Sequence, residues 1–112
     1  MTSVLNTIKK MLGIDESIDH FDTDIIVCIN SSLSVVKQLG IGDPDFNVSD
    51  STETWEDFIG DRKDLEFLKS YIYLKTRLMF DPPTNAFLVD SMDRHIKEFE
   101  WRLREQEEEE IG

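Results

Sequence analysis

The sequence predicts an all-α fold, a small bundle of about four helices plus one short helical turn, with a long C-terminal helix. Apolar residues recur every three or four positions in four segments, which is the period of an amphipathic helix. Glycines or prolines separate these segments, and none alternates apolar and polar residues for long enough to indicate a sheet. Because 112 residues is the size of one domain, we expect a single helical domain over residues 1–104, followed by an acidic tail over 105–112.

The first segment, residues 3–12, predicts a short amphipathic helix. Ser3 is a suitable N-terminal cap and Gly13 a suitable stop. The apolar positions are Val4, Leu5, Ile8, Met11 and Leu12. Ten residues with two lysines are weak support for membrane binding, so we expect this helix to dock on the core of the domain.

A second helix is predicted to follow an acidic linker, with Asp22 or Thr23 as its cap, and to end at Leu39 before a glycine. Its apolar stripe comprises Ile25, Ile29, Leu33, Val36 and Leu39. The only cysteine of the chain, Cys28, excludes an internal disulfide. Its apolar neighbours in the sequence indicate a small, buried side chain.

Residues 40–53 predict a loop, because they hold two glycines, a proline and many small polar residues. The loop is long for a compact domain, and long loops often carry function. Gly40, Gly42, Asp43, Asp45 and Asn47 of this loop are therefore candidate functional residues. The stretch "TWEDFIG" that follows predicts one helical turn, which would place Trp55 and Phe58 in the core.

A third helix is predicted over about residues 61–80, with an apolar face wide enough to form the centre of the core. This face comprises Leu65, Phe67, Leu68, Tyr71, Ile72, Leu74, Leu78 and Met79. The helix is expected to stop at a rigid corner of Asp81, Pro82 and Pro83, because proline lacks an N–H and biases the residue before it away from the helical region. Thr84 or its neighbour would then restart a helix near residue 86, and no chemistry is needed to explain the corner.

The last helix is predicted over about residues 85–106, with an apolar seam of Leu88, Met92, Ile96, Phe99 and Leu103. Four pairs place an acid four residues before a base: Asp90 with Arg94, Asp93 with Lys97, Glu98 with Arg102, and Glu100 with Arg104. Each contributes about 0.2 to 0.5 kcal/mol, so this helix can be partly self-supporting and project from the domain. The terminal "EQEEEE" is expected to fray, because acids are unfavourable at the negative end of a helix.

The charge of the chain limits its partners. Its net charge is −12 and its pI is near 4.4, which disfavours tight nucleic-acid binding because few phosphate counterions would be released. The N-terminus lacks the apolar run and cleavage site of a signal peptide, and no stretch of eighteen apolar residues predicts a membrane span. An acidic surface suits solubility, a basic partner, or repulsion of nearby DNA.

Residues that could carry chemistry have simpler structural explanations. The stretch "DHFDTD" holds possible metal ligands, but its spacing does not match a calcium loop, and a solvated linker that caps a helix explains it. His95 lies beside the seam of the last helix, where a partly buried packing role is expected. A set of aromatic residues could stack bases, but helix-core spacing favours packing: Tyr71, Tyr73, Phe80, Phe87, Phe99 and Trp101. The sequence therefore predicts no catalytic site, no metal and no cofactor, which indicates an interaction protein rather than an enzyme.

The stretch "LKSYIYLKTRLMFDPPTNAFLVDSMDRHIKEFEWRLRE" resembles the head–tail connector proteins of long-tailed bacteriophages, which are also described as adaptor, head-completion or DNA-packaging proteins. The features that carry the resemblance are the helix end "RLMFDPP", the restart "TNAF" and the closing helix "HIKEFEWRL". The upstream order, "TDIIVCINSSLSVVKQLG" and then "WEDFIG", also matches the layout of the family. The resemblance covers roughly residues 4–104, and the terminal glutamate run has no counterpart in it.

The resemblance implies an all-α structural protein of the virion, made in the host bacterial cytoplasm. Members form a ring, typically of twelve copies, beneath the portal protein at the unique vertex of the filled head. The ring extends the DNA channel and presents a surface to the next head-completion or tail component. Members have no catalytic site and no cofactor.

Two regions are candidates for contacts in such an assembly. The last helix is the candidate for portal or subunit contacts, through Arg94, Lys97, Trp101, Arg102 and Arg104. Burial of Trp101 at the end of the bundle, and pairing of the arginines on a solvated face, are the structural alternatives. The loop of residues 40–51 is the second candidate, for channel or inter-subunit contacts through Gly40, Gly42, Asp43, Asp45 and Asn47. Two other classes remain open: an acidic DNA mimic that inhibits a DNA-binding enzyme, and a small metal-dependent enzyme.

Overall fold

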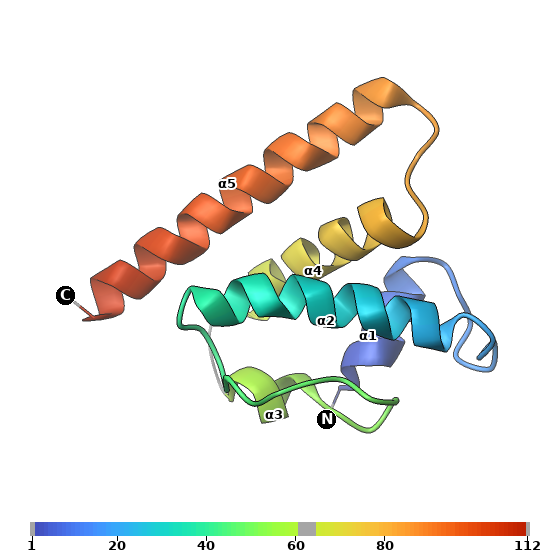
Figure 1. Ribbon diagram of the computed structural model, residues 1–112, viewed down its shortest axis with the longest axis horizontal. Helices are drawn as coiled ribbons and strands as arrows, with labels where there is room; N and C mark the ends of the chain where they lie inside the picture. Colours follow the sequence, from blue (N-terminus) through green and yellow to red (C-terminus); the bar gives the residue numbers. More distant parts are fainter. Residues whose placement is uncertain (1, 61–64, 112) are drawn as a thin grey trace.

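The computed structural model describes residues 2–60 and 65–111 of the chain, with side chains described as far as residue 105. Five helices follow one another: α1 (Val4–Met11), α2 (Asp22–Gln38), α3 (Trp55–Ile59), α4 (Leu65–Phe80) and α5 (Ala86–Ile111). Within the described ranges the only β-type pairing is an isolated bridge between Ser3 and Thr54. The prediction of an all-α bundle with a short extra turn is confirmed (Figure 1).

The start of α1 follows the predicted capping chemistry. The side chain of Ser3 accepts a hydrogen bond from the N–H of Asn6 at 3.2 Å, and Gly13 leaves the helix with a φ of 81°. Val4, Leu5 and Ile8 are buried, so the prediction that this helix docks on the core is confirmed.

Lys9 is a feature of α1 that the sequence did not predict. Its side chain is only 1% exposed, and its Nζ donates to the backbone carbonyls of Glu16 (3.1 Å) and Ile18 (2.6 Å). It also lies 2.9 Å from Oδ1 of Asp22, at the start of α2. A buried ammonium needs such partners, because an unpaired charge in the interior is costly. Lys9 therefore ties the α1–α2 linker to both helices.

The predicted cap of α2 is wrong. Phe21 occupies the N-cap position and makes no side-chain capping hydrogen bond, and Asp22 is the first helical residue. The carboxylate of Asp22 pairs with Lys9 instead of capping the helix. Local capping preferences favour Asp22 or Thr23 as the cap of α2. A lysine buried thirteen positions before Asp22 overrides these preferences.

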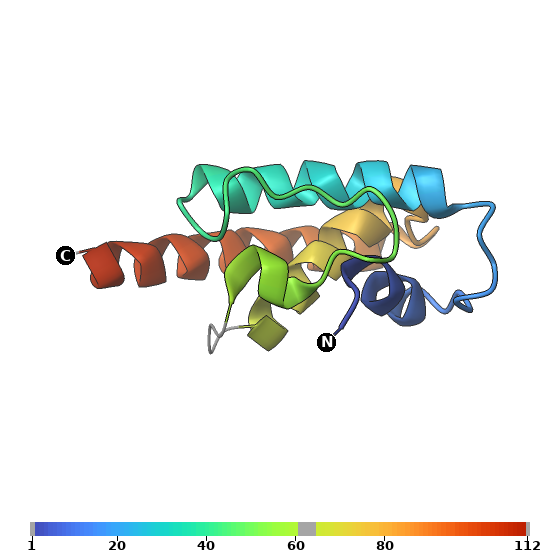
Figure 2. The same ribbon diagram turned by 90° about the horizontal axis from the view of Figure 1, so that it is seen from below.

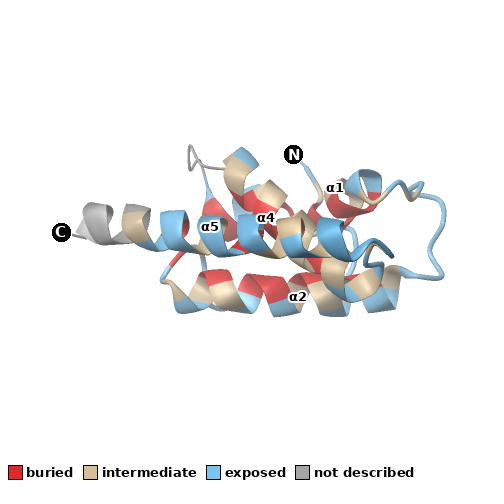
Figure 3. Cartoon of the chain, turned by 90° about the horizontal axis from the view of Figure 1, so that it is seen from above, coloured by how far each residue is buried: buried red, intermediate tan, exposed pale blue. Residues whose placement is uncertain are grey.

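The core lies where α1, α2 and α4 face one another. The most extensive helix–helix contact is between α2 and α4, and α4 also contacts α1 and α5. Figure 3 shows the buried residues concentrated on these facing surfaces. The α2 stripe is buried as predicted, except that Leu39 is half-buried, and α3 buries Trp55 and Phe58 as predicted. In the view of Figure 2, α2 forms one layer and α1 and α3 lie on the other side.

The loop of residues 40–53 is irregular but well anchored. Its apolar residues Ile41, Phe46 and Val48 are buried, which the sequence analysis did not foresee. Asn30 of α2 exchanges two hydrogen bonds with the backbone of Val48, each of 2.9 Å. Lys37 donates to the carbonyl of Phe46 at 2.8 Å. Side chains of α2 thus make the hydrogen bonds to the loop backbone that a neighbouring strand would make in a sheet.

The corner between α4 and α5 forms where it was predicted. The side chain of Arg77 donates to the carbonyl of Asp81 at 2.7 Å and closes the end of α4. Asn85, the neighbour of Thr84, caps α5 by accepting hydrogen bonds from the N–H groups of residues 87 (2.8 Å) and 88 (3.3 Å). Figure 1 shows that α5 then runs back at an angle to α4, so that the two helices diverge at the corner.

Several predicted boundaries and core positions need correction. The helix α5 continues to Ile111, past the predicted end near residue 106. The predicted first turn of the third helix, residues 61–64, lies outside the described residues. Met79 and Leu88 were predicted in the core but are exposed, because α4 and α5 diverge beside the corner that joins them. That the acidic tail frays stays a prediction.

Candidate interaction surfaces

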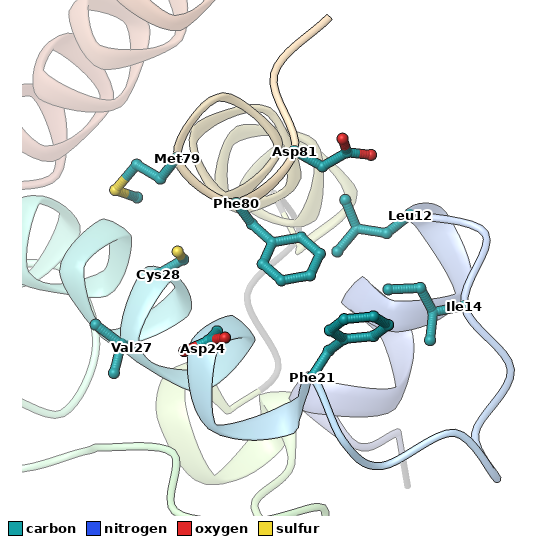
Figure 4. Close-up of a pocket in the computed structure, with 9 residues that line it drawn as sticks. All are labelled: Leu12, Ile14, Phe21, Asp24, Val27, Cys28, Met79, Phe80 and Asp81. Carbon is teal, nitrogen blue, oxygen red and sulfur yellow. The ribbon is translucent and has the colours of Figure 1, made fainter.

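An apolar groove opens between the end of α1, the first half of α2 and the end of α4. Its volume is about 750 Å³. The residues that line it are Leu12, Ile14, Phe21, Asp24, Val27, Cys28, Met79, Phe80 and Asp81. Figure 4 shows Phe80 and Phe21 at the centre, and their rings meet edge to face with centroids 5.8 Å apart. Because Lys9 holds the linker at residues 16 and 18, it also supports the wall that carries Ile14 and Phe21.

Cys28 lies in this groove. The sequence indicated a buried side chain, but Cys28 is half-buried and its sulfur faces the groove (Figure 4). Partial burial, and then the negative charge of Asp24, raises the pKa of the thiol. The thiol is therefore less nucleophilic than a free one, and a catalytic role does not follow from it.

The part of α5 from Ile96 to Leu103 is anchored on α4. Ile96 and Leu103 are buried, and the rings of Phe67 and Phe99 meet edge to face with centroids 4.5 Å apart. The hydroxyl of Tyr71 donates to Oε2 of Glu100 at 2.7 Å. Burial, and then this hydrogen bond to a carboxylate, raises the pKa of Tyr71 well above its usual value. The phenol therefore stays protonated, and a hydrogen-bond donor, at neutral pH.

The predicted ion pairs on α5 are only partly present. Within its described part, Asp93 pairs with Lys97 (3.0 Å) and Glu98 pairs with Arg102 (2.6 Å). Glu100 does not pair with Arg104 as predicted, because it faces α4, where Tyr71 and Lys75 approach it. Periodicity along one helix could not reveal this competing partner on another.

The opposite face of α5 is exposed. Trp101 has 59% of its surface exposed, so its predicted burial at the end of the bundle is wrong. Phe87, also predicted to pack in the core, is 76% exposed. Arg94, Lys97 and Arg104 are exposed and share the face of Trp101, because positions 94, 97, 101 and 104 are separated by three, four and three residues. Arg102 lies to the side of this face, in its pair with Glu98.

The chain is similar to a described protein family over nearly its whole length. The family model described as "Phage connector protein" matches residues 4–110. This chain belongs to the phage connector protein family. The connector is thus a bacteriophage head–tail protein of a structural, non-catalytic family, and works with other phage head or tail proteins in the virion. No curated protein and no solved structure matches it.

The candidate loop of the connector forms a separate surface. Gly40, Asp43, Asp45 and Asn47 are exposed. Gly42 is half-buried with a φ of +76°, and a side chain there would come within 2.5 Å of the ring of Phe58. The loop lies against α2 and α3, whereas the exposed basic residues lie on α5, so the two candidate regions do not merge into one site.

The residues that could act as catalytic groups or metal ligands do not lie together in the structure. His95 is exposed rather than partly buried in packing, and Asp22 is engaged by Lys9. In the part of the chain that the structure describes, no three histidine, cysteine or carboxylate side chains gather closely enough to hold a metal ion. None of the described helices is long and apolar enough to cross a bilayer. The features with functional potential are therefore surfaces, namely the groove and the outer face of α5.

Proposed function

We propose that this connector is the structural adaptor beneath the portal, where copies of the chain form a ring that extends the DNA channel. Membership of the phage connector family carries the proposal. The family resemblance implies twelve copies, docking on the portal protein, and a surface for the next head-completion or tail component. The fold supports a docking role, because one face of α5 is exposed while Ile96 and Leu103 on its other face are buried against the core.

The charge of the connector fits passage of DNA. A channel that bound phosphates tightly would hold the genome during ejection, and a net charge of −12 gives little attraction to DNA. The connector therefore needs no tight nucleic-acid binding, and the family resemblance implies no cofactor and no catalytic residue. It is made in the host bacterial cytoplasm and acts in the virion, at the head–tail interface.

Two sets of residues are assigned to the contacts of this assembly. The portal or subunit contacts are Arg94, Lys97, Trp101, Arg102 and Arg104 on α5. The channel or inter-subunit loop contributes Gly40, Gly42, Asp43, Asp45 and Asn47. The corner at residues 81–83 sets the direction in which α5 presents its face.

The proposal is tested by a tagged pull-down from phage-infected cells, with the co-purifying proteins identified by mass spectrometry. We expect the portal protein and a tail-side component. A matched control is Ser34→Glu, on the exposed side of α2, compared with Arg94→Glu on α5. The α5 variant is expected to recover less assembly while the α2 variant recovers as much as the unaltered chain. Recovery of a host nuclease or polymerase without the portal would overturn the proposal in favour of a DNA mimic.

A further inference from the structure

The exposed face of α5 carries one regular pattern. We define the α5 stripe as Arg94, Lys97, Trp101 and Arg104. Three cations, of which Lys97 is paired with Asp93 at 3.0 Å, flank an exposed indole on the side of the helix opposite the seam of Ile96, Phe99 and Leu103. Tryptophan and arginine are enriched at protein interfaces and at their energetic centres. The stripe has the composition of a docking surface that would bind an apolar, acidic site.

The groove has the complementary composition. Its wall is apolar, and two carboxylates, Asp24 and Asp81, line it. Residues 11–36, which form the linker and most of α2, contain no lysine and no arginine. The acids of that segment are Asp15, Glu16, Asp19, Asp22 and Asp24. Apart from Asp22, which Lys9 neutralises, these acids lack a cation within their own segment. The groove therefore suits a partner with an apolar anchor and several positive charges.

The α5 stripe cannot reach the groove of its own chain. It lies on the exposed face of α5, opposite the buried seam, while the groove lies among α1, α2 and α4 (Figure 4). A contact between stripe and groove must therefore join two copies through different patches. Such heterologous contacts generate closed rings when the rotation between copies closes. The start of α5 offers a second apolar patch at Phe87, but Asp90 and Asp93 follow it, which mismatches the acidic rim.

We propose that the α5 stripe of one connector docks in the groove of the neighbouring copy, with Trp101 as the apolar anchor. This inference rests on the proposed ring and names the contact that builds it. Charge complementarity favours a second copy of the chain as the partner that fills the groove, because the chain carries both the cationic stripe and the acidic groove. The rim acids would then pair with cations of the next subunit, which lets a strongly acidic chain assemble side by side.

Thiol cross-linking tests the contact, because the groove already contains Cys28. The variant Lys97→Cys places a second thiol in the middle of the stripe. A flexible bis-maleimide is applied to the free protein and to the protein bound to portal rings. We expect a ladder of dimers, trimers and larger species, because each chain would link through its groove to one neighbour and through its stripe to another.

Three matched variants sharpen the result. His95→Cys is exposed on the same helix but off the stripe, and we expect no ladder from it. Lys97→Cys combined with Cys28→Ser removes the groove thiol and should lose every species larger than a dimer. Val27→Asp in the Lys97→Cys chain should also lose the ladder, and because Val27 is largely exposed the fold should persist, as far-UV circular dichroism would verify.

The outcomes separate this inference from the proposed function. Recovery of the portal by the unaltered chain, together with no cross-linked ladder from the Lys97→Cys chain, would overturn the contact and leave the adaptor role standing. A ladder without any portal binding would support the contact and overturn the adaptor role. Cross-linking of Cys28 to a different protein would assign the groove to that partner and overturn the inference. Equal ladders from His95→Cys and Lys97→Cys would also overturn it, because the contact would then not depend on the stripe.

Discussion

The loop of residues 40–53 is irregular but packed on the rest of the chain, whereas the first turns of α5 are regular helix but exposed. The loop has no repeating secondary structure, yet Phe46 is only 7% exposed and α2 holds its backbone through Asn30 and Lys37. The first turns of α5 are regular helix, yet Phe87 is 76% exposed. Hydrogen-bonded regularity is a local property, whereas anchoring depends on apolar burial against the rest of the chain.

The difference indicates where assembly contacts would form. A surface that the chain has already covered has little left to offer a partner. The groove and the outer face of α5 retain exposed apolar side chains, whereas the loop has turned its apolar side chains inward. We therefore expect stability to depend on the loop and association to depend on α5.

The largest effect is expected from Phe46→Ala. Removing this buried ring should lower the free energy of unfolding by about 3 to 5 kcal/mol, because a core cavity replaces it. The matched change Phe87→Ala should alter it by no more than about 0.5 kcal/mol. Urea denaturation followed by circular dichroism measures both. Equal losses from the two variants would contradict the comparison, since one phenylalanine is in a loop and the other in a helix.

The next effect concerns the backbone of the loop at Gly42. An alanine there adopts a left-handed conformation, at about 1 to 2 kcal/mol, and its Cβ would also meet the ring of Phe58 at 2.5 Å. Gly42→Ala should therefore lower the free energy of unfolding by about 2 to 4 kcal/mol. Gly13→Ala is the control, because Gly13 has a φ of +81° but no atom within 4 Å of its would-be side chain. Comparing the thermal melts of the two variants isolates the steric cost of the contact with Phe58. Identical shifts in melting temperature would disprove that cost.

The sequence sufficed for the elements whose signals are local. Helical spacing located four helices, the serine at position 3 and the asparagine at 85 provided caps, and consecutive prolines predicted the corner. The family followed from the order and spacing of the same segments. Because these features depend on neighbouring residues, one chain carries enough information to find them.

What escaped the sequence depends on distant partners. Nothing local marks Lys9 as buried, because its partners are two carbonyls and a carboxylate in a later segment. The exposure of Leu88 follows from the angle between α4 and α5, which periodicity does not encode, whereas Trp101 is exposed because it lies on the face of α5 opposite the seam. The groove is likewise a product of three helices meeting, so only its residues, and not their convergence, were visible beforehand.

A smaller effect is expected where α5 regains its anchoring. Tyr71→Phe removes the hydrogen bond to Glu100 while keeping the ring, and should cost about 1.5 kcal/mol because the acceptor is charged. Tyr73→Phe is the control, since the hydroxyl of Tyr73 accepts only from Arg77 of its own helix. Amide hydrogen exchange should accelerate in α5 for the first variant and not for the second. Unchanged exchange in α5 would show that the hydrogen bond from Tyr71 does not help to hold this helix on α4.

The smallest effect is expected on the polar side of the loop, where the pH dependence of stability is measured. Burial acts to raise the pKa of Glu53, but hydrogen bonds from the hydroxyl of Ser49 and the N–H of Asp50 lower it more, and the net pKa lies below 4.5. A carboxylate whose pKa is depressed by folding stabilises the fold above its unfolded pKa, and that contribution is lost as the pH falls through the folded pKa. Glu53→Gln should therefore be less stable by under about 1 kcal/mol above pH 4.5, since water screens the site. The difference should vanish in more acidic solution. A difference that stayed constant across this range in urea titrations would mean that Glu53 holds the loop by shape rather than by its charge.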